Sequence, residues 1–178
     1  MWPLLPGWFA CPKQSQTERA RGTYAWRVMR GDQTDLKRVW LANTGDIQFT
    51  ALQAIHKGSK GYYTSPFLHA SLSRDDAVQW LNRAREGYGP LPADPDAYLV
   101  MIDLAKIPKE RVIDLSSHEK QKQFLGQRAN DDHILELIHQ QKNPPMTLAE
   151  GWKEVLILGR GWFVEHYMER ARDPFRPA

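Results

Sequence analysis

Hydrophobic positions along the chain follow two different periods, and each period predicts one kind of element. Residues 23–29 alternate between two sets of side chains, as a strand with two different faces does. Residues 154–158 are apolar behind an acidic first residue, which predicts a buried strand. Further strands are predicted just before residue 73, at 98–104 and at 111–115.

Helices are predicted where apolar residues recur three and four positions apart. Four such residues fall on one face of a helix over about 74–86: Ala77, Trp80, Leu81 and Ala84. Ser73 and Asp76 have the form of a capping box at the start of this helix. Other helices are predicted at about 49–56, from a second capping box at Ser116 and Glu119 to about 125, at 130–141 up to Pro144-Pro145, and at 163–171.

The order of these elements indicates the fold class. Strands and helices are mixed without the regular strand–helix alternation of a doubly wound sheet, so an α+β fold is predicted. A chain of 178 residues has the usual size of one domain. We assign residues 21–178 to a single domain, and residues 1–20, with three prolines and a polar run, to a loosely ordered N-terminal leader.

Composition indicates a folded protein and gives no sign of a nucleic-acid-binding surface. Hydrophobic residues make up 42% of the chain and aromatic residues 11%, which argues against disorder. The formal net charge is +3, but residues 1–30 hold five basic residues and one acidic residue, so they contribute +4 and residues 31–178 sum to −1. The folded body therefore needs no basic face, although a short N-terminal arm could contact phosphates.

The available residues exclude several kinds of site. The single cysteine, Cys11, leaves no intrachain disulfide and no four-cysteine metal site. No two histidines stand three or four residues apart, so no metal is predicted. No apolar run reaches the length of a membrane span, and the apolar N-terminus lacks the basic start of a signal peptide. A cytoplasmic location is the default expectation, and delivery as a toxin by a non-classical route would leave the same pattern.

Three candidate elements remain, and they occur in a defined order. Arg27 lies on the first predicted strand. His69 and Ser71 lie on the strand that leads into the capped helix. Glu154 begins the last apolar strand, where a carboxylate is costly unless it is paired or lies at the mouth of a cleft.

This order resembles the Arg–Ser–Glu mono-ADP-ribosyltransferases over roughly residues 23–165. In that family an early strand carries Arg, a Phe-x-Ser-Thr-Ser strand leads into a helix, and a late strand begins with Glu. The chain has His69 in place of the first Ser of that strand. The resemblance implies an α+β, ADP-ribosyltransferase-like fold with a split, curved β-sheet and flanking helices. It also implies NAD as a substrate and no metal.

The resemblance further implies a role for each site residue. Glu154 would be the catalytic carboxylate, with Ser71 and His69 orienting the nicotinamide ribose. Arg27 would hold the pyrophosphate as a two-pronged cation. Aromatic residues would complete the NAD-binding set: Tyr62, Tyr63, Phe67 and Trp152.

The acceptor of ADP-ribose stays open: a protein, a nucleic acid or a small molecule. Arginine-modifying members of the family carry Glu, and asparagine-modifying members Gln, at the position that Trp152 occupies here. Because an indole cannot accept a hydrogen bond from a guanidinium, protein arginine is not predicted as the acceptor. Two alternatives use the same cleft: an NAD glycohydrolase with water as acceptor, and a non-catalytic domain that binds NAD, ADP-ribose or a protein.

Overall fold

The computed structural model describes residues 24–31, 46–57, 65–89, 92–139, 144–158 and 168–175. Its strands form one antiparallel sheet in the order β4-β5-β2-β1-β3-β6. The strands are β1 (Tyr24–Met29), β2 (Phe67–Ser71), β3 (Tyr98–Asp103), β4 (Val112–Asp114), β5 (Glu154–Leu158) and β6 (Met168–Arg170). The predicted α+β class is confirmed.

Five α-helices lie among the described residues, together with three short 3₁₀ turns. The helices are α2 (Ile47–Lys57), α3 (Arg74–Glu86), α4 (His118–Leu125), α5 (Asp132–Ile138) and α6 (Pro145–Gly151). The 3₁₀ turns are η1 (Leu104–Lys106), η2 (Lys109–Arg111) and η3 (Gly126–Asn130). None of the helices in the described ranges combines the length and the apolar character needed to cross a bilayer.

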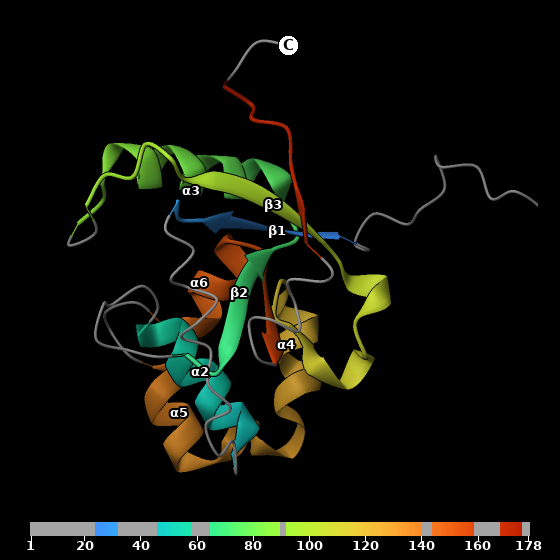
Figure 1. The fold of residues 1–178 in the computed structure, drawn as a ribbon. Helices are drawn as coiled ribbons and strands as arrows, with labels where there is room; N and C mark the ends of the chain where they lie inside the picture. The colour runs from blue at the N-terminus through green and yellow to red at the C-terminus, as the bar shows by residue number, and fades with distance from the viewer. Residues whose placement is uncertain are drawn as a thin grey trace, which may run out of the picture.

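The sheet bends sharply between β1 and β2. Trp26 and Ser71 form the registered pair that joins these two strands, whereas β1 pairs with β3 along all six of its residues and β2 pairs with β5 along all five. Figure 1 shows β2 running steeply across the direction of β1 and β3. The curved sheet therefore consists of a β1–β3–β6 part and a β4–β5–β2 part.

Different helices cover the two parts of the sheet, so helices lie on either side of the bend. Helix α3 lies along β1 and β3 (Figure 1), and its Leu81 is fully buried against Leu99 of β3. Helices α2 and α6 cover the other part, where Phe67 and Leu156 pack with alanines of both helices. The opposite face of the sheet carries a third apolar cluster that continues across the bend, with Met29 of β1 and Ile157 of β5 among its members.

Arg128 connects the start of α2 with the start of α5 through hydrogen bonds. The Asp46 carboxylate accepts the backbone N–H of Phe49 at the start of α2, and Asp131 caps α5. Arg128 donates hydrogen bonds to both carboxylates. These hydrogen bonds from Arg128 are the main reason that the pKa of Asp46 and the pKa of Asp131 are lowered from their ordinary values.

Most predicted elements are confirmed, two predictions are wrong, and one helix was not predicted. Ser117, not Ser116, caps α4, because the Ser116 hydroxyl donates to Asp114 instead. Pro145 begins a helix, α6, that the sequence analysis did not predict, since proline is well suited to the first turn of a helix. The helix predicted over 163–171 is contradicted at 168–170, which form β6 beside β3. The predicted leader, residues 1–20, lies outside the described residues.

Candidate functional site

The site is built on one cross-strand row of residues at the bend of the sheet. Ser71 of β2 lies directly opposite Trp26 of β1 and directly opposite Glu154 of β5. Residues directly opposite each other in an antiparallel pair project from the same face, which we call the site face. His69, two residues before Ser71, projects from the site face as well.

The site face is covered on both sides of this row but not by the same helices. Trp26 and Val28 pack beneath α3, and Phe67 and Leu156 pack beneath α2 and α6. His69 and Glu154 lie between these two covered areas and stay partly accessible, with side chains 25% and 13% exposed.

The carboxylate of Glu154 is held by the imidazole of His69. Nδ1 of His69 lies 2.5 Å from Oε1 of Glu154, a short, charge-assisted hydrogen bond. The two residues are diagonal neighbours, because His69 pairs with Leu156 while Glu154 pairs with Ser71. The other ring nitrogen of His69, Nε2, lies 3.1 Å from the hydroxyl of Ser65.

Ser71 connects the start of β5 with the start of α3. Its hydroxyl donates to the carbonyl of Trp152 at 2.7 Å and accepts the backbone N–H of Ser73 at 2.9 Å. Ser73 in turn caps α3 by accepting the N–H of Asp76. Of the two hydrogen bonds of the predicted capping box, the one from the N–H of Asp76 to Ser73 is present. The N–H of Ser73 donates to the hydroxyl of Ser71 instead. Ser71 therefore fixes the backbone on both sides of the bend.

The two residues before Glu154 form a tight turn after α6. Trp152 caps the helix, and Lys153 has φ of 49°, the left-handed region that glycine usually occupies. The carbonyl of Lys153 accepts the N–H of Leu72 at 2.8 Å, which extends the β2–β5 pairing by one bond. A non-glycine residue held in this conformation stores strain beside Glu154, as is common near functional sites.

The ring of Trp152 belongs to a cluster of aromatic residues around an arginine on α3. Trp152 packs against Trp80 with ring centroids 5.0 Å apart. The guanidinium of Arg83 lies 5.0 to 5.4 Å from the ring centroids of Trp80, Tyr88 and Trp152. The backbone carbonyl of Trp152 connects this cluster to Ser71, and Trp152 precedes Glu154 by two residues.

Arg27 makes a different contact from the one the sequence analysis assigned to it. It alternates with Trp26 along β1 and so lies on the face opposite the site face. Its Nη1 donates to the carbonyl of His69 at 2.7 Å, which holds β2 to β1 where the strands diverge. The predicted phosphate contact stays a prediction. On the site face, the guanidinium of Arg74 lies 5.6 Å from the ring of Trp26.

One of the aromatic residues predicted to bind NAD lies in the core instead. Phe67 is 1% exposed and packs in the core beneath α2 and α6, so its ring faces those helices and not a ligand. We therefore omit Phe67 from the proposed site. Tyr62 and Tyr63 lie outside the described residues.

Three residues of the site were missed by the sequence analysis: Ser65, Trp80 and Arg83. Ser65 had a usable signal, because it is a hydroxyl residue just before the strand that carries His69 and Ser71. Arg83 had a weaker one, three positions after Trp80 on a predicted helix. The contact of both helical residues with Trp152 depends on the tertiary fold.

Two other features of the described residues bear on the site. No group of three or more His, Cys, Asp or Glu side chains in these ranges could hold a metal ion. A polar hollow lined by Arg85, Tyr98 and Arg170 lies at the β3–β6 side, away from Glu154.

Comparison of the chain with protein-family models, with curated proteins and with solved structures found no match.

Proposed function

We propose that this chain is an NAD-dependent mono-ADP-ribosyltransferase, with the split, curved sheet of that family as its core. The observation that carries the proposal is the partly buried carboxylate of Glu154, which accepts a hydrogen bond from His69 and stands opposite Ser71 at the bend of the sheet. A carboxylate fixed in this way in a partly desolvated position is suited to stabilise positive charge.

The reaction would proceed through a charge-separated state on the ribose. As the bond between C1′ and the nicotinamide nitrogen breaks, its electron pair leaves with nicotinamide and positive charge develops on the ribose, as in glycoside hydrolysis. Glu154 would accept a hydrogen bond from a ribose hydroxyl and face this charge. The acceptor would then attack C1′ and lose a proton. Because the charge exists only in the transition state, this stabilisation raises the rate and not only the affinity.

The remaining residues would bind and orient NAD. His69 and Ser71 would hold Glu154 and the segment around it, and Trp152 would offer an aromatic surface beside it. The resemblance assigns the pyrophosphate to Arg27, which would have to reach it from the face opposite the site face. Arg74 is a second candidate for this role, because it lies over Trp26 on the site face.

Two alternatives are each favoured by one observation. An indole at position 152 cannot accept a hydrogen bond from an attacking guanidinium, which favours water as acceptor and hence an NAD glycohydrolase. The hydroxyl of Ser71 is already engaged with Trp152 and Ser73, which favours a domain that binds NAD, ADP-ribose or a protein without catalysis.

A nicotinamide-release assay with purified protein and NAD tests the proposal. Release that increases when an acceptor is added, with ADP-ribose recovered on that acceptor, supports a transferase. Release of nicotinamide with free ADP-ribose as the other product, whichever acceptor is present, supports the glycohydrolase. NAD binding by calorimetry without release supports the binding domain. Absence of both NAD binding and nicotinamide release contradicts the transferase, the glycohydrolase and an NAD-binding domain, and leaves only a domain that binds ADP-ribose or a protein.

A further inference from the structure

Ser65 contacts the imidazole of His69 on the side opposite Glu154. Its hydroxyl lies 3.1 Å from Nε2, while Nδ1 of the same ring lies 2.5 Å from the carboxylate of Glu154. Three side chains thus form one continuous chain of hydrogen bonds: Ser65, His69 and Glu154. None of the three is fully exposed.

When the imidazole is neutral, the chemistry of these groups fixes the direction of both hydrogen bonds. An ionised carboxylate can only accept, so the proton between His69 and Glu154 belongs to Nδ1. In a neutral imidazole the other nitrogen, Nε2, is then an acceptor and needs a donor. The hydroxyl of Ser65 already accepts the backbone N–H of Phe67 at 3.1 Å, which leaves its own proton available for Nε2.

We propose that Ser65 is a positioning residue that fixes the plane of the His69 ring and, together with the carboxylate of Glu154, favours the Nδ1–H tautomer. With the other tautomer, the lone pair of Nδ1 would face the carboxylate of Glu154 and repel it. By donating to Nε2, Ser65 keeps His69 as the donor that holds Glu154. The effect of this tautomer on the rate of NAD cleavage rests on the proposed function, whereas the preference for the tautomer does not.

Nuclear magnetic resonance measures this tautomer directly. In ¹⁵N-labelled full-length protein, long-range ¹H–¹⁵N correlations distinguish a protonated ring nitrogen from a bare one. We expect Nδ1 of His69 to be protonated and Nε2 bare in the wild type. In Ser65→Ala the signals should shift towards a mixture of tautomers, and Ser65→Thr, which keeps the hydroxyl, should restore the wild-type pattern.

Ser117→Ala is the matched control. Ser117 also accepts a backbone N–H, that of Lys120 at the start of α4, but it has no contact with His69. Its loss should lower Tm, as the loss of a helix cap does, and leave the His69 signals unchanged. If Ser65→Ala keeps the wild-type tautomer, or if Ser117→Ala changes it equally, the proposal is overturned.

Kinetics and labelling extend the test. Ser65→Ala should lower kcat for NAD cleavage about tenfold or more with little change in KM, as the loss of a supporting hydrogen bond does at other sites. If the wild type does not cleave NAD but the tautomer shifts as described, the positioning role stands and the proposed function fails. Covalent labelling of Ser65 by a fluorophosphonate would instead identify a nucleophile and overturn the positioning role.

Discussion

Replacing Glu154 by Gln removes one negative charge and changes little else. Gln has the same length and keeps an oxygen that can accept from Nδ1 of His69, which now lies 2.5 Å away. What is lost is the carboxylate that would face the positive charge on the ribose. Loss of one such preorganised group costs about 3 kcal/mol, which corresponds to a decrease in turnover of roughly two orders of magnitude.

The same substitution should affect folding much less. A hydrogen bond to a charged group contributes about 1.5–3 kcal/mol, and a neutral one about 0.5–1.5 kcal/mol. The change from carboxylate to amide should therefore lower the free energy of unfolding by about 1 kcal/mol. For a domain of this size that corresponds to a Tm lower by a few degrees, roughly 2–4 °C.

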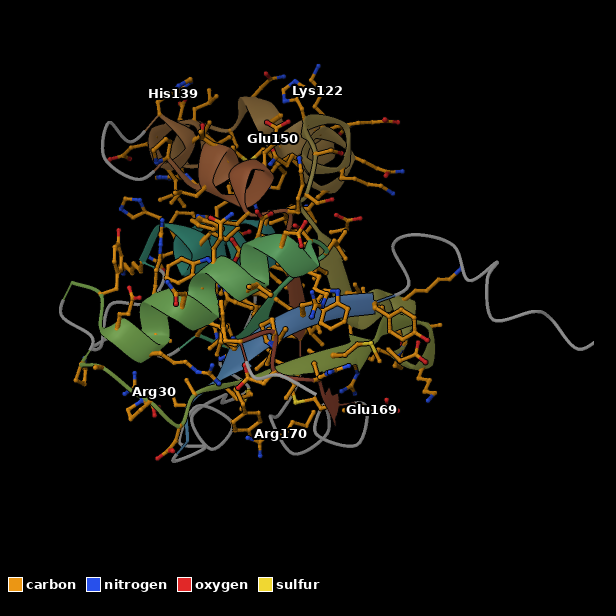
Figure 2. The ribbon with its side chains drawn as sticks, turned by 90° about the horizontal axis from the view of Figure 1, so that it is seen from above. Arg30, Lys122, His139, Glu150, Glu169 and Arg170 are labelled. Atoms are coloured by element: carbon orange, nitrogen blue, oxygen red, sulfur yellow. The ribbon has the colours of Figure 1, made fainter. Side chains whose placement is uncertain are left out.

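Glu150→Gln is the matched control for this experiment. Glu150 lies on α6, four residues earlier, and is exposed among the helices on the side of the molecule away from Glu169 and Arg170 (Figure 2). It should keep both the rate and the Tm of the wild type. The assay is nicotinamide release at saturating NAD, with Tm measured by circular dichroism on the same samples. Wild-type turnover in Glu154→Gln, with a loss in Glu150→Gln, would refute the assignment.

Three further predictions concern Arg27, His69 and Arg128. Arg27→Ala should raise KM for NAD more than it lowers kcat, in release assays across NAD concentrations; an unchanged KM with a lowered Tm would leave Arg27 only its hydrogen bond to His69. His69→Asn, which keeps a donor near Nδ1, should retain most of the turnover that His69→Leu loses, and full activity of the Leu variant would mean that the site is misplaced. Arg128→Gln should lower Tm near neutral pH, where the lowered pKa of Asp46 stabilises the native state, and this difference should shrink as the pH falls below the ordinary pKa of the carboxyl group, 3.8. A constant difference would contradict the role of that hydrogen bond.

Local elements could be predicted from the sequence because local rules determine them. The helix over 74–86 has both an apolar face and a capping serine, and the observed α3 spans Arg74–Glu86 with Ser73 as its cap. The strand at 154–158 was predicted with the observed bounds, because a short run of aliphatic residues behind one acidic residue is typical of a buried strand. In both cases composition, period and end signals agree.

Elements whose state depends on distant partners could not be predicted. Residues 168–170 have the composition of a helix end, yet Met168 pairs with Ile102 of β3, and the sheet decides the conformation. The pair Pro144-Pro145 was interpreted as a stop for the preceding helix. It is also the start of the next one, since the missing N–H of proline costs nothing in the first helical turn.

The site was predictable only in part, because the sequence gives the residues and not their register. Nothing local shows that Ser71 lies opposite Glu154 and not one residue further on, which would turn the carboxylate to the other face. Arg27 illustrates the reverse case. The alternation in residues 23–29 separated Arg27 from Trp26, and that separation already placed Arg27 on the face opposite the site face. The resemblance alone assigned it to the cleft.

The register also explains what a histidine at position 69 achieves that a serine there could not. His69 and Glu154 are diagonal neighbours across β2 and β5, and the Cα atoms of such neighbours lie about 7–8 Å apart. The imidazole reaches the carboxylate across that distance with Nδ1, whereas a serine has one short hydroxyl and no second polar side-chain atom. A ring in this place brings a second nitrogen that also needs a partner, and Ser65 supplies it. The histidine is therefore not an isolated departure from the Ser-Thr-Ser pattern: restoring serine at position 69 would leave both Glu154 and Ser65 without their present partner.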